Sequence, residues 1–248
     1  MRVEPYRWRA SGSFAAHFWK AATQQHHREL APLIRRLVPG QGVVFDVGAH
    51  AGQFTKLFAR AASSGHVYAF EPGSYARTIL RSVVWLHRLD NVTIVPAALG
   101  AEAGTAALNM PIKASGARGF GLAHLGDAEA RWASVAQETV AQTRLDDAVA
   151  GLGLDRLDFI KADIEGWEMQ MLQGARGALR RFRPRLVLEL TAPHLARAGD
   201  TLDGAFRLLA ELGYCAFLLR PDGRLAPAGP GEGDLWFLPR EDPVIREL

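Results

Sequence analysis

Short apolar runs rich in β-branched and aromatic residues alternate with segments of helical spacing through the middle of the chain. The runs that we expect to form strands are Val43–Val47, Val67–Glu71, Val92–Val95, Leu157–Asp163 and Arg185–Leu190. Helical spacing follows at about 53–62, 74–87 and 166–182. Because the runs are continuously apolar, each strand is expected to be buried on both faces of a parallel sheet with helices on both sides. The pattern predicts an α/β protein.

The two ends of the chain differ from this middle part. From Phe14 to Val38 the apolar residues fall at helical spacing, and Pro39 and Gly40 end the segment. We expect an N-terminal helical extension over 1–40, followed by one domain over 41–248. Near the C-terminus a predicted helix at about 202–212 precedes two strands, Tyr214–Leu219 and Asp234–Leu238, and their Pro/Gly-rich connection predicts antiparallel pairing.

Residues 100–141 interrupt the alternation of strands and helices. Two short extended pieces, 105–109 and 138–142, flank a glycine-rich segment at 115–121. Long insertions of this kind in compact enzymes are usually functional loops. We therefore expect a flap that faces the substrate.

Composition restricts the compartment and the class of protein. A chain of 248 residues that is 48% hydrophobic can bury one sizeable core. Cys215 is the single cysteine, so no internal disulfide can form, and no apolar run approaches the roughly 20 residues that cross a bilayer. The first residues lack the apolar stretch of a secretory signal. These features predict a cytoplasmic protein without a membrane span.

The formal net charge is +3 and the sequence pI is about 9.3. Acidic residues are scattered among the arginines, and the densest basic stretch, Arg176–Arg185, ends a predicted helix, where cations meet the helix dipole favourably. No basic motif interleaved with aromatic residues is present. A nucleic-acid partner is therefore not expected.

The turn after the first strand carries the pattern Asp-x-Gly-x-x-x-Gly, made by Asp46, Gly48 and Gly52. Glycine lets the backbone approach a ligand closely. A dinucleotide site would present Gly-x-Gly-x-x-Gly instead. An acid beside the turn would repel a pyrophosphate but suits an ammonium group, such as that of S-adenosylmethionine. The alternative is a tight turn that binds no ligand.

Further candidates follow the second and third strands. Glu71 lies 25 positions after Asp46 and could accept hydrogen bonds from both hydroxyls of a ribose; the alternative is a solvated strand-end carboxylate. Ala97 and Ala98 would leave room for a flat adenine ring, although both could equally be packing residues.

The fourth strand ends in three acids, Asp163, Glu165 and Glu168. Ligands bind at the carboxyl ends of strands in open α/β sheets. These acids could anchor a divalent cation, act as a general base, or cap the following helix. We assign Asp163 and Glu165 to the active site and expect capping to account for at least one of the three.

These motifs together resemble the FkbM family of methyltransferases. The matching pieces are Phe45–Gly52, Ala69–Pro72, Ala97–Gly100, Leu145–Asp147, Phe159–Glu168 and Leu186–Leu190. The resemblance implies a Rossmann-like class I methyltransferase fold with a seven-stranded, mostly parallel sheet whose last strand is antiparallel. It also implies S-adenosylmethionine as cofactor and O-methylation of sugars or secondary metabolites.

Position by position, the resemblance places Gly48 with its neighbours Ala49 and His50 at the methionyl part of the cofactor. Glu71, with Pro72 beside it, would lie at the ribose, and Asp163 near the reacting centre. We expect His50 to shape the turn or to lie over the cofactor.

Methyl transfer to an alcohol needs in-line positioning and the loss of one proton. A positioned base contributes roughly 10²–10⁴-fold, and Asp163 or Glu165 could supply it, with His194 after the fifth strand as a competitor. A Mg²⁺ ion held by Asp163 and other acids is an alternative. The metal requirement and the base stay open at this point.

Three rival functions remain. An NAD-dependent oxidoreductase is disfavoured by the missing Gly-x-Gly-x-x-Gly and Tyr-x-x-x-Lys patterns. A catalytically inactive cofactor-binding scaffold would not need Asp163 and Glu165. N-methylation is disfavoured because no Asn/Asp-Pro-Pro-Tyr motif follows the fourth strand. We expect a hydroxyl acceptor on a small molecule or glycan; the acceptor's identity and a homo-oligomeric state stay open.

Overall fold

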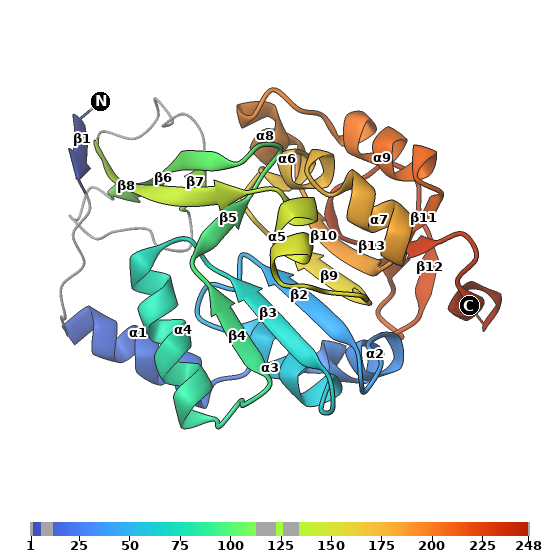
Figure 1. The fold of residues 1–248 in the computed structure, drawn as a ribbon, viewed down its shortest axis with the longest axis horizontal. Coiled ribbons are helices and arrows are strands. Elements are labelled where there is room, and N and C mark those ends of the chain that lie inside the picture. Colours follow the sequence, from blue (N-terminus) through green and yellow to red (C-terminus); the bar gives the residue numbers. More distant parts are fainter. Residues whose placement is uncertain (1, 6–11, 113–122, 126–133, 248) are drawn as a thin grey trace.

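The structure is a computed structural model that describes residues 2–5, 12–112, 123–125 and 134–247. Its centre is an eight-stranded sheet with the order β12-β11-β13-β10-β9-β2-β3-β4 (Figure 1). In chain order the strands are β2 (Val43–Val47), β3 (His66–Phe70), β4 (Val92–Val95), β9 (Phe159–Ala162), β10 (Arg185–Leu190), β11 (Tyr214–Leu219), β12 (Leu225–Pro227) and β13 (Gly233–Pro239). The strands β4, β3, β2, β9 and β10 are parallel neighbours, whereas β13 runs antiparallel to both β10 and β11.

The α/β class and the antiparallel pairing of the closing strands were thus predicted correctly. The sheet has one strand more than the seven expected, because part of the Pro/Gly-rich connection itself forms β12. Gly223 takes a φ of 81°, and the N–H of Arg220 donates to the carbonyl of Arg224 at 2.8 Å. This tight turn returns the chain along β11, where β12 pairs antiparallel.

Helices cover both faces of the sheet because successive strand residues are apolar on both sides. Val44, Phe159 and Trp236 pack against α2 (Ala31–Leu37) and α3 (Gln53–Ala61), and Ala69 packs against α4 (Ser74–Leu86). The opposite face packs against α5 (Leu145–Gly151), α6 (Glu168–Gln173), α7 (Arg176–Phe182) and α9 (Leu202–Glu211).

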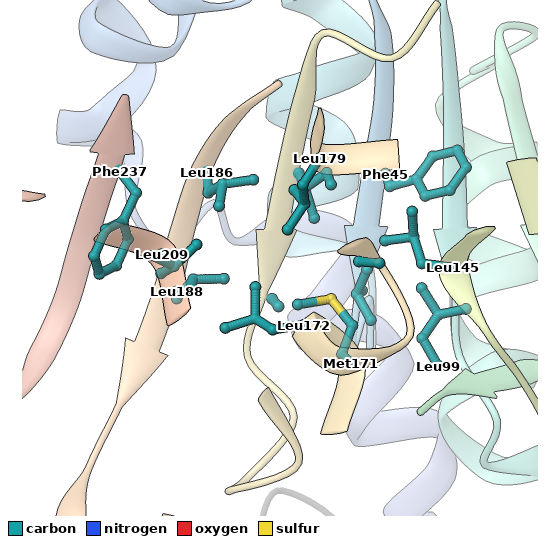
Figure 2. Packing of buried hydrophobic residues seen from close by; sticks show 14 of the residues in the cluster. Phe45, Leu99, Leu145, Met171, Leu172, Leu179, Leu186, Leu188, Leu209 and Phe237 are labelled. Atoms are coloured by element: carbon teal, nitrogen blue, oxygen red, sulfur yellow. The ribbon is translucent and has the colours of Figure 1, made fainter. Parts of the chain in front are cut away.

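Figure 2 shows this second face, where Phe45, Leu186, Leu188 and Phe237 of the strands meet Leu172 and other helix side chains. Leu186 and Leu188 are fully buried, as is Leu172. Each such side chain contributes about 1.5–3 kcal/mol through its removal from water. The two-sided burial explains why the strand runs are continuously apolar.

A second, smaller sheet lies beyond the carboxyl ends of the central strands (Figure 1). It consists of β1 (Arg2–Pro5), β5 (Ala97–Leu99), β6 (Gly104–Ile112), β7 (His124–Leu125) and β8 (Ser134–Thr143). β6 and β8 pair antiparallel from Gly104↔Gln142 to Ile112↔Ser134. The described parts of the predicted insertion therefore form a sheet whose strands β6 and β8 are longer than expected, and the glycine-rich part at 115–121 lies outside the described residues.

The N-terminal extension also differs from the expected helices. It contains α1 (Gly12–Thr23), a short 3-10 turn at Arg28–Leu30 and α2, but it begins with β1, which pairs parallel with β8. Ala21 of α1 packs with Met110 and Ala136 of the second sheet and with Ile79 of α4. The extension therefore ties the second sheet to the helices of the central domain.

Candidate active site

A cavity of about 290 Å³ lies between the carboxyl ends of β2, β3 and β9 and the second sheet. Of the residues that the sequence singled out, nine line it. These are Gly48, Ala49, His50, Glu71, Pro72, Ala97, Ala98, Asp163 and Glu165. Asp46, Gly52 and His194 do not line the cavity.

The turn after β2 is shaped by its backbone. Gly48 has a φ of 74°, and a Cβ there would lie 2.0 Å from the carbonyl oxygen of Asp163. The N–H groups of Gly48 and Ala49 both donate to the carbonyl of Phe70, at 3.0 and 3.1 Å. Only glycine allows the ends of β2 and β9 to approach so closely.

Gly52 does not line the cavity, which disfavours the direct contact with the cofactor expected from the sequence. It is the N-cap of α3 with a φ of 84°, and a Cβ there would lie 2.7 Å from Leu80 Cδ1. Its function is therefore the sharp entry into the helix.

Asp46 is completely buried beneath the cavity, which argues against direct contact with a cofactor ammonium. Side chains alternate along β2, so Asp46 points, as Val44 does, toward α3. There Thr55 Oγ1 donates to its Oδ2 at 2.6 Å. Lys161 Nζ lies 3.9 Å from its other oxygen. Burial raises the pKa of Asp46, although Lys161 and Thr55 oppose the shift.

Glu71 is only 7% exposed and lines the cavity at the end of β3. Its Oε2 accepts the N–H of His50 and its Oε1 the N–H of Gly73, both at 2.8 Å. Burial raises the pKa of Glu71 to about 7 despite these hydrogen bonds. A group that donates hydrogen bonds to Glu71 would favour its ionised form.

Apolar side chains form the part of the cavity beyond Glu71. Phe70 is the last residue of β3. The others come from the second sheet, where Ala97 and Ala98 lie in β5, Leu108 in β6 and Leu125 in β7. This slot suits a flat, largely apolar ring. The sequence indicated the two alanines but not the leucines of the second sheet.

Lys161 is the residue whose importance sequence reasoning missed most clearly. It stands opposite Asp46 in the β2–β9 register and is 4% exposed. Its Nζ lies 3.3 Å from Asp163 Oδ2 and donates to the carbonyl of Gly48 at 3.2 Å. Burial alone would lower the pKa of Lys161, but Asp163 and Asp46 raise it. The sequence did contain a signal for this role, because Lys161 is a lysine within an otherwise apolar strand.

Asp163 also contacts Glu189 at the end of β10, a residue with no role assigned from sequence. The hydrogen bond between the two carboxyl groups, together with burial, raises the pKa of Glu189 to about 8. Burial would raise the pKa of Asp163 as well, but Lys161 and the hydrogen bond from Glu189 hold it below its ordinary value. Asp163 is therefore the ionised member of this pair at neutral pH.

Glu165 and His194 meet at the rim of the cavity. His194 Nδ1 lies 3.2 Å from Glu165 Oε2, and Arg197 donates to the carbonyl of Glu165 at 2.7 Å. His194 belongs to α8 (Ala192–Arg197), which follows β10. Gly166 has a φ of 101°, and a Cβ there would lie 2.2 Å from the carbonyl oxygen of His194. The glycine thus allows α8 to approach Glu165.

Glu168 has a structural role, but it is not the helix cap expected for one of the three acids, because α6 begins without a side-chain cap. It is 1% exposed, and its Oε1 accepts the N–H of Ile164 at 2.9 Å, which closes the turn between β9 and α6. Burial raises its pKa to about 7.

The N-terminal extension supplies part of the cavity wall, as its position before the first strand of the central sheet allows. His27 lines the cavity, and its ring stacks on that of Phe54, with 4.7 Å between the centroids. Tyr75 also lines it, and its hydroxyl lies 2.6 Å from His17 Nδ1 of α1. Segments distant in sequence therefore enclose the cavity.

Two further observations concern metals and membranes. Among the described residues, no group of three or more His, Cys, Asp and Glu side chains is arranged to hold a metal ion. Within the same parts of the chain, no helix has both the length and the apolar character needed to cross a bilayer.

The central strand order and the cavity at the carboxyl ends of its parallel strands define a Rossmann-like fold of the class I methyltransferase type. A family profile described as "Methyltransferase FkbM domain" matches residues 46–215. This chain belongs to that family of FkbM methyltransferase domains. No curated protein matches the chain in a sequence search.

Solved structures share the fold. A methyltransferase FkbM from Methylobacillus flagellatus is 17% identical with a TM-score of 0.50; the match covers 91% of this chain but 59% of that one. A putative methyltransferase from Streptococcus mutans in complex with SAH is 10% identical with a TM-score of 0.50, covering 87% and 98%. An O-methyltransferase from Bacillus cereus, also in complex with SAH, is 14% identical with a TM-score of 0.50, covering 92% and 91%.

Proposed function

We propose that this protein transfers a methyl group from S-adenosylmethionine to a hydroxyl oxygen of a sugar, a glycolipid or a secondary metabolite. The observation that carries the proposal is Glu165, which lines the cavity together with Asp163 and has His194 Nδ1 at 3.2 Å from its Oε2. A carboxylate that orients an imidazole is an arrangement suited to accepting a proton from an alcohol.

The cavity fits the cofactor in its chemistry. The carboxylate of Glu71 can accept hydrogen bonds from the ribose hydroxyls, and the slot of Phe70 and Leu108 suits the adenine ring. Asp163, which Lys161 keeps ionised, is the acid in the cavity wall suited to the ammonium of the methionyl part. The backbone of Gly48 lets that part lie close to the turn. When bound, the cofactor supplies a methyl group activated by a positive sulfur.

The residues of this chain then position the acceptor and remove its proton. His194 accepts the proton while Glu165 stabilises the resulting imidazolium. Asp163 is a weaker base because its pKa is held low, so its role is electrostatic. The proposed mechanism does not use Mg²⁺, because the ammonium of Lys161 lies 3.3 Å from Asp163 Oδ2 and would compete with a metal ion for this carboxylate.

Oxygen is preferred over nitrogen as acceptor because Asp163-Ile164-Glu165-Gly166 stands where an Asn/Asp-Pro-Pro-Tyr motif would be expected. N-methylation and an inactive scaffold remain the alternatives. A cytoplasmic location and a homo-oligomer stay predictions.

The first experiment is isothermal titration with S-adenosylhomocysteine (SAH) and, separately, NADH. Wild-type protein should bind SAH and not NADH. Glu71→Ala should abolish or strongly weaken SAH binding, while Glu102→Ala, an exposed glutamate outside the cavity, should not. Folded wild-type protein that fails to bind SAH would contradict the proposal.

The second experiment tests the base. With an accepted hydroxyl substrate, His194→Ala and Glu165→Gln should each lower kcat by roughly 10²–10⁴-fold. The Kd for SAH should stay within about twofold, and chelation by EDTA should leave the rate unchanged. Unchanged kcat in both variants would remove His194 and Glu165 from the mechanism.

A further inference from the structure

A second cavity, of about 440 Å³, lies among the helices of the N-terminal half. Its walls come from the end of α1, the 3-10 turn and α2, the middle of α3 and the end of α4. It is separate from the cofactor cavity, and the two have no lining residue in common.

The charge of this second cavity is of one sign. Its basic lining residues are Arg28, Arg35, Lys56, Arg60 and His87, and no Asp or Glu lines it among the described residues. Some arginines elsewhere are paired with carboxylates, as Arg185 is with Asp242 at 2.6 Å and Arg183 with Glu241 at 2.6 Å. No described carboxylate forms such an ion pair with Arg28, Arg35 or Arg60.

Three elements present these cations to the same cavity. Arg28 lies on the 3-10 turn and Arg35 on α2, and both line the cavity. Lys56 and Arg60 lie four residues apart on α3 and share one face of that helix. The three arginines are exposed, whereas Lys56 is 2% exposed.

The back of the cavity is held by hydrogen bonds to the end of α1. Lys56 Nζ donates to the carbonyls of Ala21 and Gln24 at 2.7 and 2.9 Å, and His87 Nε2 lies 2.9 Å from the carbonyl oxygen of Ala22. Burial and the charge of Arg60 lower the pKa of Lys56 to about 8. A bound anion near Lys56 would stabilise its charged ammonium form, which burial and Arg60 disfavour.

We propose that this cavity binds a phosphate-bearing ligand through Arg28, Arg35 and Arg60. Guanidinium groups present parallel N–H donors that match phosphate oxygens, and a concave site of one charge concentrates the field on its ligand. The site is independent of the residues assigned to methyl transfer. The phosphate group belongs either to a free phosphorylated molecule or to a lipid headgroup. In both cases the same guanidinium groups would bind the phosphate oxygens.

The test uses inorganic pyrophosphate in calorimetry, and flotation with phosphatidylcholine vesicles that contain or lack phosphatidic acid. The variants are the double substitution Arg35→Gln with Arg60→Gln, and the matched control Arg207→Gln, an exposed arginine of α9. None of these residues lines the cofactor cavity, so SAH binding should be unchanged and serves as the check on folding.

Pyrophosphate should bind the wild type and Arg207→Gln equally and the double variant at least about tenfold more weakly, a loss of about 1.4 kcal/mol. Flotation only with phosphatidic acid, lost in the double variant, would assign the phosphate to a lipid headgroup; pyrophosphate binding without flotation would assign it to a free molecule. Equal binding of the double variant and the control to both probes, or no binding of either probe to the wild type, would overturn the proposal.

Discussion

Glu71 combines a buried position with a role that requires negative charge. Its pKa is about 7 in the folded protein because of burial, against 4.5 ordinarily. Between these pH values the folded state binds more protons than the unfolded state, so this residue makes the protein less stable as the pH rises from 4.5 to 7. The shift corresponds to about 3 kcal/mol. The buried carboxylate of Glu71 therefore lowers the free energy of unfolding at neutral pH.

A ligand that donates hydrogen bonds to Glu71 should reverse this effect. We expect SAH to bind about tenfold more weakly at pH 6 than at pH 8, because binding must displace the proton of Glu71. Titrations at pH 6 in buffers of different ionisation enthalpy should show proton release. In Glu71→Gln the proton release should vanish; an identical affinity of the wild type at both pH values would contradict this role.

Gly48 allows a test of the backbone of the site. Gly48→Ala places a Cβ 2.0 Å from the Asp163 carbonyl at a φ of 74°, and it should lower the free energy of unfolding by about 2 kcal/mol or more and weaken SAH binding. Urea denaturation measures the first effect and calorimetry the second. Gly40→Ala, where nothing lies within 4 Å, is the matched control and should change neither.

At the scale of elements, Arg185 joins three separate segments. It lies at the start of β10, forms two hydrogen bonds to Asp242 at 2.6 and 3.0 Å, and donates to the carbonyl of Leu37 at the end of α2. Asp242 is 7% exposed. The C-terminal segment, the central sheet and α2 are therefore linked by one side chain.

Arg185→Met should destabilise the protein by about 3–5 kcal/mol, because it leaves the carboxylate of Asp242 buried without its cation. Arg156→Met is the matched control. Arg156 also forms two hydrogen bonds to an aspartate, Asp158, but its side chain is 45% exposed, so the loss should be at most about 1 kcal/mol. Similar losses in both variants, measured by urea denaturation, would refute the argument from burial.

At the scale of the whole molecule, the second sheet is joined to helix α4 of the central domain by a side chain. Glu138 of β8 accepts hydrogen bonds from both the N–H and the hydroxyl of Ser74, at 3.1 and 3.0 Å. Ser74 is the first residue of α4, and its N–H has no partner within the helix. A side chain of the second sheet thus caps a helix of the central domain.

Glu138→Ala should cost about 1 kcal/mol, the usual loss of a cap. We also expect faster amide hydrogen exchange in β6 and β8 and weaker SAH binding, because Leu108 and Leu125 of the second sheet line the cavity. Exchange in β9 should not change. Unaltered exchange in the second sheet would show that this link does not hold it in place.

The sequence alone was sufficient for the order of the five parallel strands of the central sheet and the helices between them, and for the acids at the strand ends. Burial on both faces requires continuous apolar runs, and the turn requires glycine at Gly48, so these features are local and leave a pattern in the chain. Glu71, Asp163 and Glu165 could be placed at the same edge because parallel strands end there together.

Only the tertiary structure decided which of these side chains meet, and in which direction each points. Asp46 points to α3, Lys161 and Glu189 contact Asp163, and the second sheet and His27 form walls of the cavity. It also brought Arg28, Arg35 and Arg60, scattered along the chain, to one cavity. The physical reason is that side-chain encounters depend on strand register and helix docking, which are set by contacts between residues distant in sequence.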